Sequence, residues 1–126
     1  MTGERFEELV EEVLEGLPAE FAERLDSITV VVEDWPTSDQ LHGARVKRRQ
    51  ELLGLYEGVP LTKRSSWHTS KLPDKISIFR KPIEMRSRSE AETIKLVQEV
   101  VYHEIAHYFG IGDRRLDEIR NQKRRR

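Results

Sequence analysis

The sequence predicts a single α+β domain in which a small twisted mixed sheet packs against one long helix. Its 126 residues suffice for one compact domain, which we expect to span residues 1–126, and leave little room for a second. Two segments, 27–34 and 75–82, have the β-branched or alternating composition of strands. Residues 89–109 contain no proline or glycine and keep a helical spacing of apolar residues.

The first third of the chain predicts two helices, a strand and a loop. Apolar residues recur at helical spacing over 6–17 with glutamates between them, which indicates an amphipathic helix. A short helix over 18–25 follows, because proline suits the first turn of a helix. The β-branched run at 27–34 favours a strand that is buried on both faces. Residues 35–43 are rich in turn-formers and favour a loop.

The middle of the chain predicts further strands. LLGLYEG at 52–58 and LTKRSS after Pro60 together indicate a hairpin. KISIFRKP at 75–82 alternates apolar and polar residues, so we expect a strand with one exposed side. Pro82 ends its pairing potential, which is typical of an edge strand.

The long helix has start and stop signals of its own. Ser89 and Glu92 match a capping box, and Gly110 has the position of a C-cap glycine. On a helical wheel Tyr102 falls on the solvent arc, whereas His103 and His107 fall at the border of the buried arc. We expect one last short helix at about 114–121.

The composition restricts the classes of function. Cysteine is absent, so any metal must be bound by nitrogen and oxygen ligands. The formal net charge of −1 gives no global field toward nucleic acid or an anionic membrane. No apolar run is long enough to cross a bilayer, and the acidic first residues lack the pattern of a secretion signal. We therefore expect a cytoplasmic monomer with no nucleic-acid or membrane partner.

The stretch HEIAHYFGIGD at 103–113 has residue types that bind a catalytic metal. His103 and His107 are four residues apart, which places their Cβ atoms about 5–6 Å apart on one helix face. Two imidazoles at that spacing can bind one zinc ion at about 2.0–2.1 Å each. Glu104 points away from this pair and can reach a water on the metal, which is the position of the general base in the HExxH arrangement.

A straight helix cannot supply the third ligand, so the turn after it matters. Gly110 can take a positive φ and reverse the chain, and Asp113 follows three residues later. Its carboxylate could then return to the ion. Asp117 and Glu118 are alternatives that lie further into the last helix.

This ligand set predicts a hydrolase. Two histidines and one carboxylate leave a position open for water, which is typical of catalytic zinc. Zinc lowers the pKa of that water toward about 7, and Glu104 takes the proton and passes it to the leaving amine. The expected substrate is a peptide or protein. Five side chains are candidate donors to the oxyanion, and the sequence does not choose among them: His42, His68, Arg80, Arg86 and Tyr102.

The complete pattern His103-Glu104-x-x-His107-x-x-Gly110-x-x-Asp113 resembles the HExxHxxGxxD signature of the aspartate-ligated zincin metallopeptidases. Every position of the signature is filled. The resemblance implies a minimal zincin-like domain with zinc on the two histidines and the aspartate, and with the glutamate as base.

The resemblance extends beyond the signature. LGLYEGVPLT and LPDKISIFRKP are similar to segments of a group of small bacterial zincin-like domains. In zincins an edge strand above the active-site helix pairs with the peptide substrate. By that resemblance the strand near residues 75–80 is the candidate here.

Two other functions remain open. One is a metal-dependent endoribonuclease, since one such family uses the pattern HxxxHxxGxDH. The glutamate after His103, the lack of a nearby third histidine and the near-neutral charge count against it. The other is a metal-stabilised interaction module without catalytic activity.

Overall fold

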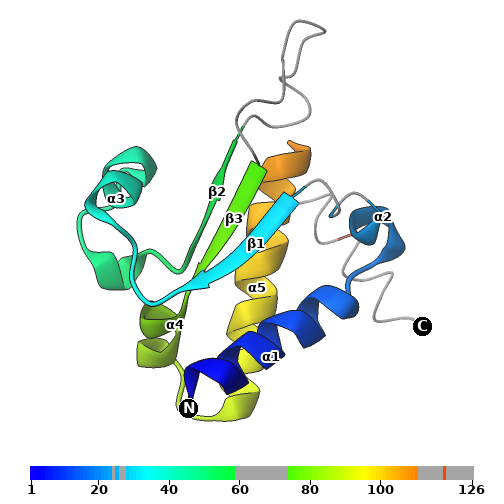
Figure 1. Ribbon diagram of the computed structural model, residues 1–126, viewed down its shortest axis with the longest axis horizontal. Coiled ribbons are helices and arrows are strands. Elements are labelled where there is room, and N and C mark those ends of the chain that lie inside the picture. The colour runs from blue at the N-terminus through cyan, green and yellow to red at the C-terminus, as the bar shows by residue number, and fades with distance from the viewer. Residues whose placement is uncertain (24, 26–27, 59–73, 111–117, 119–126) are drawn as a thin grey trace, which may run out of the picture.

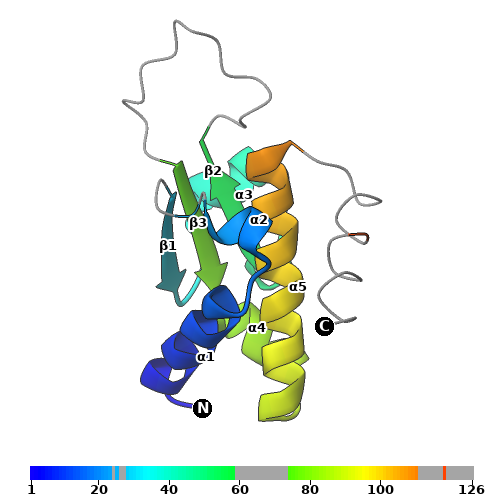
Figure 2. The same ribbon diagram turned by 90° about the vertical axis from the view of Figure 1, so that its right-hand side faces the viewer.

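The fold has one layer of strands and one layer of helices, as the computed structural model shows (Figures 1 and 2). The structure describes residues 1–23, 25, 28–58, 74–110 and 118. Within these residues the strands are β1 (Ile28–Glu33), β2 (Gly54–Glu57) and β3 (Asp74–Phe79), in the order β1-β3-β2. Helices α1 (Gly3–Glu15), α2 (Ala19–Ala22) and α5 (Glu90–Phe109) lie on one face of this sheet. The predicted α+β class is confirmed.

Strand β3 lies in the centre of the sheet, so the prediction of an edge strand at 75–82 is wrong. β3 pairs with β1 in parallel and with β2 in antiparallel orientation. Five of its six residues are buried, which one exposed side would not allow. The strand also ends at Phe79, and Pro82 lies in the first turn of helix α4 (Arg80–Arg86). A proline in that turn breaks no helical hydrogen bond, which is why this segment can be helical.

Strand β1 is an edge strand among the described residues, which corrects the prediction that it is buried on both faces. Its pairing is with β3 on one side. Ile28 is buried, Thr29 is exposed, and the rest of the strand is half-buried. A β-branched composition therefore reflected strand propensity here and not complete burial.

Residues 35–43 are not a loop throughout, because helix α3 (Ser38–Ala44) begins within them. Thr37 caps this helix: its hydroxyl accepts the N–H of Gln40, and the Gln40 side chain accepts the N–H of Thr37. The residues interpreted as turn-formers are thus a capping box. A short 3₁₀ helix, η2 (Arg49–Glu51), connects α3 to β2.

The predicted hairpin at 52–66 has one strand within the described residues. That strand is β2, and its partner is β3. The segment proposed as the second arm, and the last helix expected at 114–121 apart from Glu118, lie outside the described residues.

Helix α5 follows the prediction closely. The Ser89 hydroxyl accepts the N–H of Glu92, and the Glu92 carboxylate accepts the N–H of Arg88. Gly110 ends the helix in the left-handed conformation, with φ 68°. Tyr102 departs from the prediction of a solvent-facing residue: it is buried, and its ring packs edge-on against Phe21 of α2 with centroids 6.0 Å apart.

The hydrophobic core lies between the sheet and the helices. Phe6 of α1, Ile76 and Ile78 of β3, and Val97 and Ile105 of α5 are completely buried in it. This contact fixes α5 on the sheet by burying apolar area on both layers. Among the described helices none has the length and apolar character needed to cross a membrane.

Candidate metal centre

The last third of α5 presents two histidines to solvent. His103 and His107 are one turn apart on the helix and both are exposed. The C-terminal end of α5, drawn in orange, lies away from α4 (Figure 1). At this spacing both rings can reach one ion from the same helix face. The described part of the chain therefore offers two nitrogen ligands in a geometry that suits zinc.

Glu104 differs from the two histidines in its burial. Its side chain is 10% exposed, whereas that of His107 is 63% exposed. The carboxylate points at strand β2, where Oε1 accepts a hydrogen bond of 2.7 Å from the main-chain N–H of Tyr56. The glutamate is thus held by an element that is distant in sequence.

His107 lies close to the same carboxylate oxygen. Its Nδ1 lies 3.4 Å from Glu104 Oε1. An imidazole whose Nδ1 faces a carboxylate keeps Nε2 for a metal, and such a contact is common for metal-binding histidines. The donor types and the spacing of the two histidines therefore fit a zinc ion.

Strand β2 can reach Glu104 because residue 54 is glycine. A Cβ at Gly54 would lie 2.4 Å from Val100 Cγ1 and 3.5 Å from Glu104 Cγ. The first distance is impossible unless the strand, the helix or the Val100 side chain shifts. Gly54 thus allows the close approach of β2 to α5, as glycine within a strand often does.

Tyr56 is fixed on the same side of β2. Its ring packs edge-on against Tyr108 of α5, with centroids 5.7 Å apart. Its hydroxyl donates to Oδ1 of Asp74, the buried first residue of β3, at 2.7 Å. Val100, Glu104 and Tyr108 are four residues apart in turn, so they form one face of α5 along β2.

The predicted third ligand, Asp113, stays a prediction. Asp113 and the alternative Asp117 are outside the described residues, as is His68. Among the described residues no three histidines or acidic residues form a group that could hold a metal. Glu118 is one of these residues, so it does not complete a three-residue site with the two histidines.

Four candidate oxyanion donors lie within the described residues, and two of them contact residues other than His103 and His107. Arg80, at the start of α4, forms ion pairs with Glu84 at 3.4 Å and Asp34 at 3.7 Å. Tyr102 packs against α2 as described above. Two more are exposed, His42 on α3 and Arg86 at the end of α4. The structure gives none of these four a contact with the two histidines within the described residues.

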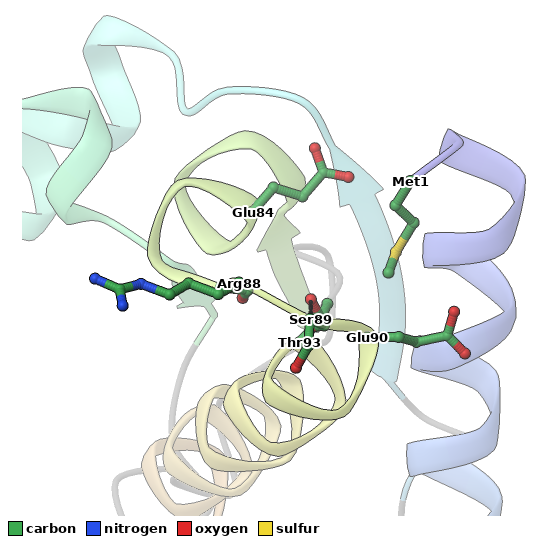
Figure 3. Close-up of a pocket in the computed structure, with 7 residues that line it drawn as sticks. Met1, Glu84, Arg88, Ser89, Glu90 and Thr93 are labelled. Carbon is green, nitrogen blue, oxygen red and sulfur yellow. Dashed lines mark hydrogen bonds between the residues drawn. The ribbon is translucent and has the colours of Figure 1, made fainter.

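Among the described residues, a cavity lies at the other end of α5. It has a volume of about 270 Å³ and lies beside the first turn of the helix, between Met1 and α4. Figure 3 shows Ser89 and Thr93 at this helix end, with Arg88 and Glu90 pointing to opposite sides. Neither histidine lines it. The cavity is therefore separate from the candidate metal centre.

The sequence did not predict the hydrogen bond from Tyr56 to Glu104 or the close approach at Gly54. A signal for it was present, because a glycine inside a strand pattern indicates a bulge or a close backbone approach. The pattern did not say which element approaches.

Comparison with known families supports a metal-dependent hydrolase. Residues 25–123 match the family model described as Zincin-like metallopeptidase, which includes β1, β3, α5 and the HEIAH segment. No curated protein matches the chain.

Proposed function

This chain belongs to the zincin-like metallopeptidase family, and on that basis we propose that it is a zinc-dependent peptidase of the aspartate-ligated group. Its substrates are peptides or proteins. The observation on which the proposal mainly rests is the contrast within α5: two exposed histidines one turn apart, with a buried and hydrogen-bonded glutamate between them.

The proposed ligands are His103, His107 and Asp113. Zinc on these residues supplies a positive charge that polarises a carbonyl group and makes water more acidic. Glu104 is the proposed base. Because Oε1 accepts the N–H of Tyr56, Oε2 is the oxygen that takes the proton from water and returns it to the leaving amine.

Strand β2 replaces β3 as the proposed partner of the substrate backbone. The N–H of Phe79 donates to the carbonyl of Leu53, so Leu53, Leu55 and Glu57 direct their main-chain groups toward β3. Gly54 and Tyr56 therefore direct theirs away from β3, and the N–H of Tyr56 reaches Glu104 of α5. The N–H of Tyr56 at this edge is bonded to Glu104, so we propose that an extended peptide pairs here with the main-chain groups of Gly54.

The first experiment measures metal content. Purified protein should contain about one zinc per chain by elemental analysis, and His103→Ala should lose it, because removal of one ligand weakens the site. His42→Ala is the matched control, since His42 is also an exposed helical histidine. Equal zinc in all three proteins would contradict the proposed site.

The second experiment measures turnover. Glu104→Gln should retain zinc and lose peptide cleavage by about 10²–10⁴-fold, the usual contribution of a general base. The assay uses a library of quenched fluorescent peptides, with a panel of RNA substrates in parallel. Cleavage of RNA alone would favour the endoribonuclease, and silence on both panels would favour the interaction module.

A further inference from the structure

The edge of β2 that faces away from β3 has a main-chain donor bonded to α5. The N–H of Tyr56 points away from β3, and the carboxylate of Glu104 accepts it at 2.7 Å. An N–H at a sheet edge normally bonds to water. Here it bonds to the side chain proposed as the catalytic base, and a hydrogen bond to a carboxylate is stronger than one between neutral groups.

Three contacts hold this N–H in place. Gly54 lets the strand approach α5, since a Cβ at that position would overlap Val100. The Tyr56 ring packs on Tyr108, and the Tyr56 hydroxyl bonds to buried Asp74. The donor is therefore built into the packing of β2 on α5 and does not depend on a mobile surface group.

We propose that the main-chain N–H of Tyr56 positions Glu104 for catalysis, and that Gly54 is the residue that makes this contact possible. The inference rests on the proposed peptidase function. The amide fixes the rotation of the carboxylate by holding Oε1, so that Oε2 is the oxygen that remains for proton transfer. Tyr56 and Gly54 are positioning residues: Tyr56 contacts the base through its N–H, and Gly54 acts by letting the strand approach the helix.

Amide hydrogen exchange tests the contact without a substrate. The Tyr56 amide should exchange slowly in the wild type and about tenfold or more faster in Glu104→Ala, because the variant removes a charge-assisted acceptor. The amides of Leu55 and Glu57, which face β3, are internal controls and should keep their protection. Fast exchange of Tyr56 in the wild type would overturn the proposal.

A steric pair of variants tests Gly54. Gly54→Ala should speed exchange at Tyr56, since the new Cβ displaces β2 from Val100. Gly54→Ala with Val100→Ala should restore protection, because the second change removes the overlapping atom. The remaining approach, 3.3 Å to the carbonyl oxygen of Ser77, needs a much smaller adjustment. Equal exchange in the single and double variants would contradict the role of Gly54.

The kinetic test compares Tyr56→Pro with Tyr56→Ala. Both lose the ring and the hydroxyl, and only proline also lacks the N–H. Proline is tolerated in edge strands, and its Cδ takes the place of the N–H proton, so the Glu104 carboxylate loses its donor and must rotate away. With the peptide that the wild type cleaves fastest, kcat of Tyr56→Pro should be about 10- to 100-fold below that of Tyr56→Ala, with similar KM, as for other partners that orient a functional side chain.

Equal kcat values would overturn the positioning role. Loss of the proposed function is distinguishable from this result. A wild type that cleaves no peptide yet protects the Tyr56 amide would remove the catalytic role together with the peptidase proposal, while the Tyr56–Glu104 contact itself would stand.

Discussion

At the scale of single residues, buried Asp74 links β3 to β2 through a hydrogen bond from Tyr56. Its carboxylate is in the interior at the start of β3, and the Tyr56 hydroxyl donates to it at 2.7 Å. A buried carboxylate costs free energy unless hydrogen bonds compensate the loss of water. Tyr56 is therefore a structural partner of Asp74 through its side chain and a partner of Glu104 through its main chain.

Removal of the Tyr56 hydroxyl should destabilise the fold. Tyr56→Phe leaves the Asp74 carboxylate with one donor fewer, and we expect a loss of about 1–3 kcal/mol in the free energy of unfolding by urea. A double-mutant cycle with Asp74→Asn is the control. A coupling energy near zero would show that the hydroxyl and the carboxylate do not interact.

The site residues differ in how far the sequence could predict them. The i, i+4 spacing of His103 and His107 follows from the helix, and the structure places both on its exposed side. The acceptor role of Glu104 toward Tyr56 joins residues 48 positions apart in the chain. No local pattern specifies a pair at such a distance, because it depends on how β2 packs on α5.

At the scale of elements, α5 is the part that local signals determine most completely. Its N-cap, its C-cap glycine and its 20 residues follow from the sequence. Helix α3 was missed because threonine, serine and aspartate occur both in turns and in helix caps. The order of the strands was missed for another reason: β3 meets its two neighbours across long stretches of chain, and alternation alone does not show which strand is central.

The N-cap of α5 gives a prediction for this element. Ser89→Ala removes the acceptor for the Glu92 N–H and should cost about 1 kcal/mol in the free energy of unfolding. Ser89→Asp keeps an acceptor at that position and is the matched control. Denaturant unfolding compares the three proteins, and an alanine variant as stable as the aspartate variant would show that the cap contributes nothing.

At the scale of the whole molecule, α1 near the N-terminus packs against α5, which comes late in the chain. They share the core through Phe6, Val97 and their neighbours, and an ion pair between Arg5 and Glu90 joins them at the surface. The hydrogen bond from Arg5 lowers the pKa of the Glu90 carboxyl below its ordinary value. The expectations of one domain, a monomer and a cytoplasmic location concern this scale too, and they stay predictions.

The Arg5–Glu90 pair should make stability depend on pH in one direction. The pKa of Glu90 is lower in the folded state than in the unfolded state. The ion pair therefore stabilises the fold above the ordinary carboxyl pKa of about 4.3, and this stabilisation is lost as the pH falls through the pKa of the folded state. The stability difference between the wild type and Glu90→Gln should thus be present at pH 7 and fade below about pH 4. Because both groups are exposed, the effect should be small and should weaken with salt.

Glu99→Gln is the control for this comparison, since Glu99 is exposed on the same helix outside the ion pair. Thermal unfolding at several pH values measures the difference. A Glu90→Gln variant that matches the wild type at neutral pH and low salt would contradict the prediction.

The close approach at Gly54 has an evolutionary consequence. Every other amino acid has a Cβ, and here that atom would overlap Val100. A lineage that loses the glycine must therefore first, or soon after, acquire a smaller side chain at position 100. In related chains the two positions should covary, with glycine kept wherever the helix retains a valine or a larger residue.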